Sequence, residues 1–191
     1  MTTTLLPAAA RVAAPWKNGG GITREIATWP PGSDLDGFHW RVSMAEVRQN
    51  GPFSKFSGVD RILTVLDGNL RLTIQDLGVI ELSPCSEPLA FDGEAPASAE
   101  LTGGPVLDLN VMTRRGLAAA RVERLISTTD VSALAGERLV FALADGVRVH
   151  EAGEMIHDLR RHDGLMTKAA LRIEASAEAP VITVELTAAP G

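Results

Sequence analysis

Short runs of alternating apolar and polar residues follow one another along most of the chain. In residues 38–47, Trp40 and Val42 occupy one set of positions, and Arg41 and Ser43 occupy the intervening set. A period of two places successive side chains on opposite faces of a β-strand. The pattern therefore predicts strands with one apolar and one polar face.

Two of the runs follow Asp-Gly turns, which are a strong short-range signal of a β-hairpin. Asp67-Gly68 precedes the alternating residues 70–74, and Asp145-Gly146 precedes residues 147–150. Because the two hairpins occupy corresponding places, they suggest a duplicated jelly roll. The other expected strands cover residues 22–29, 38–47, 62–66, 77–82, 88–91, 98–101, 106–112, 139–143, 155–159, 165–168, 170–174 and 181–186.

Turn signals recur about every 8–12 residues, and no long amphipathic helix interrupts them. We therefore expect an all-β protein with two jelly-roll or barrel halves, residues 1–115 and 116–191, and an N-terminal strand able to pack on the second half. Residues 117–126 fit either a helix or a strand, since alanines favour helix and the Val-Glu-Arg-Leu-Ile ending allows strand. We predict a polar loop over residues 127–137, with one helical turn at 131–135.

Composition excludes several classes of protein. The net charge is −6 and no run of Lys and Arg is longer than two, which argues against a nucleic-acid-binding protein. No apolar run approaches the ~20 residues of a membrane helix, and the N-terminus lacks the features of a signal peptide. The single cysteine, Cys85, excludes an internal disulfide and is predicted to be buried. We expect a cytoplasmic protein.

The spacing of the first hairpin resembles the cupin family, whose first motif places two histidines and a glutamate before a turn glycine. Arg61 and Gly68 have the spacing of that glutamate and glycine, and Ser54 and Phe56 fall at the histidine positions. No histidine occurs between His39 and His150. The resemblance thus keeps the cupin turns but lacks the metal ligands, and we expect neither a metal nor another cofactor.

Four blocks of sequence, in order, resemble the HutD/Ves family. They are Trp16-Lys-Asn-Gly-Gly-Gly with Thr23 and Glu25, then Trp40-Arg-Val-Ser-Met-Ala, then residues 51–61, and then residues 108–116. This resemblance implies a bicupin fold and a link, in many bacteria, to histidine utilisation operons. It also implies a role in sensing or modulation by a small molecule.

Polar residues alternate with leucines in the last of these blocks. Asp108, Asn110 and Met112 share one face of the strand at 106–112, and Leu107 and Leu109 share the other. If the leucines pack between sheets or subunits, the polar residues point into the barrel, where each needs a partner or a ligand. The alternative is that this face is exposed to solvent.

We predict a pocket for a small carboxylate-containing ligand on these inward faces. Arg41 and Arg61 offer bidentate donors that match a carboxylate. A glycine-rich loop contributes Lys17 and Asn18, whereas Glu25, Asp108 and Asn110 suit an amine, amide or imidazole group. The complete set of predicted ligand-binding residues is Lys17, Asn18, Glu25, Arg41, Ser43, Arg61, Asp108, Asn110 and Met112. Urocanate, formiminoglutamate and formylglutamate are ligands of this kind.

Two other functions remain open. The first is a metal-independent isomerase or hydrolase with Glu25 or Asp108 as base and Arg41 and Lys17 stabilising an anion. The second, a metal-dependent cupin oxygenase, conflicts with the missing histidines. The later histidines, His150, His157 and His162, match no standard metal spacing and are predicted to be surface or structural residues. Apolar strand residues in the second half are compatible with a homodimer.

Overall fold

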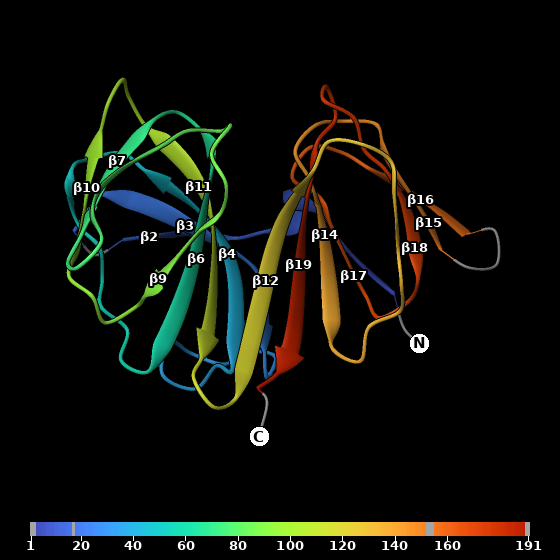
Figure 1. Cartoon of the computed structure of the whole chain (residues 1–191), viewed down its shortest axis with the longest axis horizontal. Coiled ribbons are helices and arrows are strands. Elements are labelled where there is room, and N and C mark those ends of the chain that lie inside the picture. Colours follow the sequence, from blue (N-terminus) through green and yellow to red (C-terminus); the bar gives the residue numbers. More distant parts are fainter. Residues whose placement is uncertain (1–2, 17, 152–154, 190–191) are drawn as a thin grey trace. The chain divides into compact units, whose positions relative to one another are not determined.

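The computed structural model describes residues 3–16, 18–151 and 155–189. The chain forms two compact units, each built from two antiparallel sheets (Figure 1). The unit that we call the N-terminal barrel contains residues 12–118, and the C-terminal barrel contains residues 119–188 together with residues 1–11. The described residues 3–11 therefore belong to the second barrel: β1 (Thr4–Leu6) pairs with β17 (Gly164–Thr167).

The N-terminal barrel has a six-stranded sheet, in the order β2-β3-β4-β11-β6-β9, and a four-stranded sheet, in the order β5-β10-β7-β8. The strands are β2 (Ala13–Pro15), β3 (Gly21–Trp29), β4 (Trp40–Val47), β5 (Gly51–Pro52), β6 (Val59–Asp67), β7 (Leu70–Ile74), β8 (Gly78–Leu82), β9 (Leu89–Asp92), β10 (Ala97–Leu101) and β11 (Val106–Arg114).

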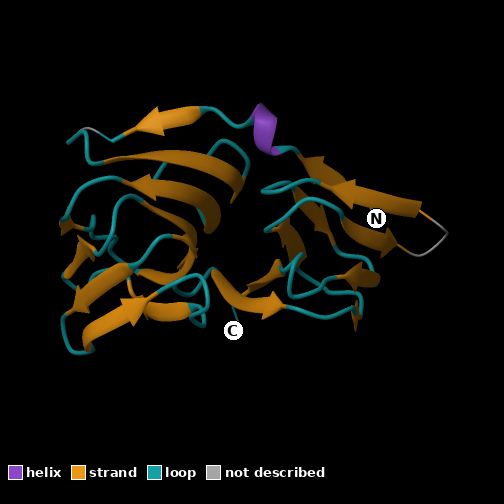
Figure 2. Ribbon diagram, turned by 90° about the horizontal axis from the view of Figure 1, so that it is seen from above, coloured by secondary structure: helices purple, strands orange, loops and turns teal. Residues whose placement is uncertain are grey.

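The C-terminal barrel has a five-stranded sheet, in the order β1-β17-β14-β19-β12, and a four-stranded sheet, in the order β13-β18-β15-β16. Its remaining strands are β12 (Ala118–Leu125), β13 (Thr129–Val131), β14 (Glu137–Ala142), β15 (Val147–Glu151), β16 (Met155–Leu159), β18 (Leu171–Glu174) and β19 (Val181–Ala188). One 3-10 turn, η1 (Ala8–Ala10), is the helical element among the described residues (Figure 2).

The prediction of an all-β protein with two barrel halves is confirmed, and the structure corrects two local expectations. The helical turn predicted at 131–135 is wrong, because Val131 ends a strand that pairs with Leu171. Cys85 is exposed because it lies in the turn after β8 rather than in a strand.

Each barrel encloses its own apolar core between its two sheets. In the N-terminal barrel, Leu63 and Val65 of β6 cluster with Leu70 and Leu72 of β7. In the C-terminal barrel, Val140 of β14 takes part in a similar cluster with residues of β15 and β18. The alternation seen in the sequence thus reflects two sheets that bury their facing sides.

The two barrels repeat the same strand arrangement. Strand β6 lies between β11 and β9, just as β14 lies between β19 and β17. Likewise β7 lies between β10 and β8, and β15 lies between β18 and β16. Positions on β6 and β14 can therefore be compared through the residues that pair with them.

No helix in the described part of the chain has the length and apolar character needed to cross a membrane.

Candidate functional site

The central strands of the six-stranded sheet place polar side chains inside the N-terminal barrel. Leu63 and Val65 lie in the core cluster, so their face of β6 points inward. Directly paired residues project from the same face of a sheet, and the register therefore identifies the inward residues of the neighbouring strands.

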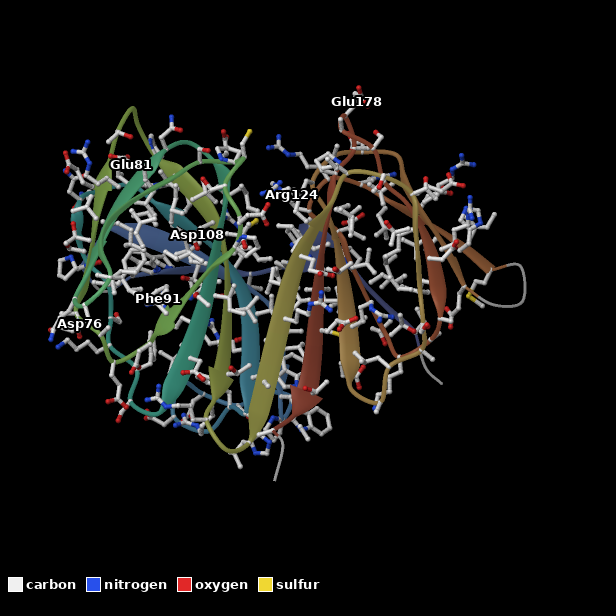
Figure 3. All side chains as sticks on the ribbon, in the orientation of Figure 1. Asp76, Glu81, Phe91, Asp108, Arg124 and Glu178 are labelled. Atoms are coloured by element: carbon white, nitrogen blue, oxygen red, sulfur yellow. The ribbon has the colours of Figure 1, made fainter. Side chains whose placement is uncertain are left out.

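Three successive rows of paired residues cross this inward face. They are the Arg61 row (Arg61, Met112, Arg41), the Asn110 row (Leu63, Asn110, Ser43, Glu25) and the Asp108 row (Val65, Asp108, Ala45). The structure thus brings together the predicted site residues Glu25, Arg41, Ser43, Arg61, Asp108, Asn110 and Met112. Asp108 lies within the barrel (Figure 3) and is 2% exposed.

Glu25 and Ser43 hold Arg41 in place. The Nε of Arg41 donates a hydrogen bond to Oε2 of Glu25 over 2.8 Å, and its Nη1 donates to Oγ of Ser43 over 3.3 Å. The Arg41 side chain is 14% exposed and that of Glu25 is 43% exposed, so the pair lies at the border between the interior and solvent. Such a pair contributes little stability by itself, but it fixes the guanidinium beside the Asn110 row.

Arg61 is buried and is surrounded mainly by aromatic rings. Its guanidinium carbon lies 5.1 Å from the ring centre of Phe53, 5.7 Å from that of Phe56 and 5.0 Å from that of Phe91. Its Nε and Nη2 both donate to Oδ1 of Asn110 over 3.4 Å. Nη1 donates to the carbonyl oxygen of Ser54, also over 3.4 Å. These hydrogen bonds are long, so the guanidinium is only weakly held.

Arg61 and Asp108 influence each other's protonation. Burial lowers the pKa of Arg61 to about 10, and the negative charge of Asp108 partly opposes this shift. Burial also raises the pKa of Asp108 to about 7, while the positive charge of Arg61 acts in the opposite direction. Desolvation is the larger cause for both groups, because an apolar interior disfavours any charge.

Asn18 of the glycine-rich loop does not join this group of residues. Asn18 is exposed, and its Oδ1 accepts a hydrogen bond from the backbone N–H of Gly20 over 3.0 Å. Gly21, where the loop meets β3, pairs with Val47, in the next row beyond Asp108 and far from Arg61. Asn18 therefore stabilises the turn, and Lys17 lies outside the described residues.

The predicted ligand-binding residues did not include the aromatic residues around Arg61, although Phe56 falls at a cupin ligand position. Phe53 and Phe56 lie in the segment between β5 and β6, inside one of the blocks that carry the family resemblance. Phe91 pairs directly with Arg61 across β6 and β9. Met112 packs with Phe38 and Val59 in a small buried cluster. Register across strands was needed to recognise these contacts.

In the C-terminal barrel, Arg138 lies two residues before the core residue Val140 of its strand, just as Arg61 lies two residues before the core residue Leu63. Arg138 of β14 pairs with Glu185 of β19, just as Arg61 of β6 pairs with Met112 of β11. Its Nη1 donates to the carbonyl oxygen of Ser132 over 2.9 Å, and its Nη2 donates to Oε1 of Glu185 over 2.7 Å. This barrel supplies its buried arginine with a carboxylate from its own chain.

The histidines of the C-terminal barrel form local pairs. His150 lies 2.8 Å from a carboxylate oxygen of Glu174, and His157 lies 3.4 Å from one of Glu151. His162 stacks on Phe141. Within the described residues, no three His, Cys, Asp or Glu side chains are grouped so that they could hold a metal ion.

Comparison with known proteins agrees with the fold and with the motifs. The HutD family model matches residues 8–183. An uncharacterised 21.2 kDa protein in the hutC 3′ region of Pseudomonas putida is 38% identical over 165 residues, covering 86% of this chain and 83% of that protein.

Solved structures of similar proteins also agree with the fold and with the motifs. A conserved protein of unknown function from Pseudomonas aeruginosa PAO1 has a TM-score of 0.88 and 34% identity, covering 97% of this chain and 99% of the other. HutD from Pseudomonas fluorescens SBW25, in a formate condition, has a TM-score of 0.87 and 31% identity, covering 99% and 100%. A cupin 2 barrel protein from Leptotrichia buccalis shares the fold, with a TM-score of 0.59 at 11% identity over 87% of this chain and 89% of the other. This chain belongs to the HutD family, which is linked to the histidine utilisation locus.

Proposed function

We propose that the N-terminal barrel binds a small organic acid whose carboxylate accepts hydrogen bonds from Arg61. The contrast between Arg61 and Arg138 supports this most strongly. Both guanidiniums are buried, and both donate to the carbonyl oxygen of a serine in the preceding segment. Arg138 also has the carboxylate of Glu185, whereas no carboxylate among the described residues forms a hydrogen bond or ion pair with Arg61.

A buried guanidinium without a close counter-charge is costly, and a bound carboxylate would supply that charge. The charge of Asp108 reaches Arg61 electrostatically, without a hydrogen bond between the two side chains. The planar fork of the guanidinium matches a carboxylate in a bidentate geometry. We therefore expect the ligand's carboxylate to compete with Ser54 and Asn110 for the same N–H donors.

The neighbouring residues suit the rest of a small polar acid. Ser43, Asn110 and Glu25 form one row beside Arg61 and Arg41, and they offer both donors and acceptors. Acids of histidine utilisation, such as urocanate and formylglutamate, have this combination of groups. In this proposal the protein is a ligand-binding regulator or modulator of that pathway.

Asp108 favours one second candidate function, that of a metal-independent isomerase or hydrolase. A carboxyl group with a pKa of about 7, close to a buried cation, is suited to general acid–base catalysis near neutral pH. Glu25 is a weaker candidate base because Arg41 binds it. NMR spectra of urocanate and formylglutamate, recorded with and without protein, separate the two functions. Shifts that saturate without turnover support the binder, and product signals support the enzyme.

Met112→Glu places a carboxylate at the position that Glu185 occupies in the other barrel. The new carboxylate is expected to bind Arg61 and to weaken formate binding by about tenfold or more, because it occupies the same donors. Formate-induced changes in the NMR spectrum measure the affinity. Met112→Gln is the matched control, since it has the same size and polarity without the charge.

Met112 is fully buried, so the folding of both variants is checked first by circular dichroism. The prediction fails if folded Met112→Glu binds formate as tightly as Met112→Gln does.

A further inference from the structure

Among the described residues, Arg61 is the group whose positive charge partly offsets a negative charge on Asp108. On β6 the charged inward residue is Arg61, and on β4 and β3 the charged residues are Arg41 and Glu25, which bind each other. Beside Asp108 in its own row lie Val65 and Ala45. The facing sheet contributes an apolar lining (Leu70, Leu72, Ile74, Leu82, Ala97 and Ala99), and β9 contributes Leu89 and Phe91.

A carboxylate bound to Arg61 would remove this compensation. The guanidinium would then share its charge between the ligand and Asp108, and two negative charges would lie in an interior that solvates neither. The arrangement is least costly when one carboxyl group is neutral. A ligand such as formate has a low pKa and binds as an anion. Asp108 is therefore the carboxyl group that is neutral in the complex.

We infer that Asp108 takes up one proton from solvent when a singly charged carboxylate binds at Arg61. This inference rests on the proposed function and adds a control by pH to it. When Asp108 is ionised, its carboxylate competes with the ligand's carboxylate for the positive charge of Arg61. When Asp108 is protonated, this competition is absent. Because burial already raises the pKa of Asp108 to about 7, the exchange falls in the physiological range of pH.

The direction of the pH dependence follows from this linkage. Below the pKa of Asp108 in the free protein, the proton is already present and affinity is independent of pH. Above that pKa, each pH unit is expected to lower the affinity for formate by about tenfold, because binding requires a proton and the proton concentration falls tenfold per pH unit. Measurements up to about pH 8.5 stay below the range in which Arg61 loses its proton.

The test is a formate titration of the full-length protein, followed by NMR at several pH values between about 6 and 8.5. In the wild type, the logarithm of the dissociation constant should rise with a slope near one above about pH 7. In Asp108→Asn that slope should be near zero, whatever the affinity at the lowest pH. Asp76→Asn is the matched control, since Asp76 is exposed, and it should keep the wild-type slope.

A second measurement on the wild type alone does not depend on how the variant folds. Calorimetric titration above neutral pH, in two buffers with different enthalpies of ionisation, should give binding heats that correspond to uptake of close to one proton. Formate binding with no proton uptake would overturn the inference and leave the proposed function intact. Failure to bind formate, urocanate and formylglutamate at any pH would overturn both.

Discussion

Arg61→Met is expected to abolish formate binding, with a loss of affinity of about 100-fold or more. The substitution removes the charge and the paired donors, while an apolar side chain of similar length still fills the space between Phe53, Phe56 and Phe91. Replacing a buried charge by a well-packed apolar group is often neutral or stabilising. We therefore expect the free energy of unfolding to change by less than about 1.5 kcal/mol, or to rise.

Formate titration by NMR and urea unfolding measure the two effects. Arg71→Met is the matched control: Arg71 is an arginine of the same barrel whose side chain is 43% exposed and paired with Glu81 and Glu100, and its loss should leave formate binding unchanged. If Arg61→Met binds formate within about threefold of wild type, a difference of less than 1 kcal/mol, then Arg61 is not the anion site. A large loss of stability would instead assign Arg61 a structural role.

Glu185→Leu is expected to have the largest effect on stability, because it leaves Arg138 buried without its carboxylate. Removing one partner of a buried ion pair typically costs about 3–5 kcal/mol, and the partial exposure of Glu185 favours the lower end, about 3 kcal/mol. Urea unfolding measures this change. Arg138→Met combined with Glu185→Leu should recover most of it, since no uncompensated charge then remains.

Formate provides a further readout on Glu185→Leu. In this variant Arg138 is a buried arginine without a carboxylate partner, as we propose for Arg61. Added formate should therefore raise the stability of the variant more than that of the wild type. Glu178→Leu, at an exposed glutamate of the C-terminal barrel (Figure 3), is the control and should leave stability nearly unchanged. If Glu185→Leu is as stable as the wild type, then Arg138 does not need a carboxylate partner, and its comparison with Arg61 no longer supports a ligand at Arg61.

The parts of the fold that depend on local pattern could be predicted from the sequence. Alternation in residues 38–47 and 106–112 correctly placed Arg41, Ser43, Asp108 and Asn110 on common faces, because the side-chain period of a strand is fixed. The helical turn at 131–135 was wrong because pairing with Leu171 outweighs local preference. Asn18 was misplaced because a loop's position along a barrel depends on register, which single strands do not reveal.

The surroundings of Arg61 could not be predicted either, because they also depend on the register between strands. Spacing to Gly68 placed Arg61 at a cupin ligand position, but the contacts with Phe53 and Phe91 depend on strands that are distant in sequence. Arg138 carried no motif, and it is recognised as the counterpart of Arg61 from the strand order and from its position before the core residue Val140. The comparison of the two arginines therefore needed the structure.

The central claim is that Arg61 binds a carboxylate, and the side-chain Nε–H signal of Arg61 in an NMR titration with formate tests it most directly. Arg61→Met assigns the signal, and sodium chloride at equal ionic strength controls for salt. Our account predicts a saturable shift of this signal, together with backbone amides of β6 and β11, and no such response to chloride. A signal that stays unchanged through the formate titration, or moves equally with chloride, would contradict the account.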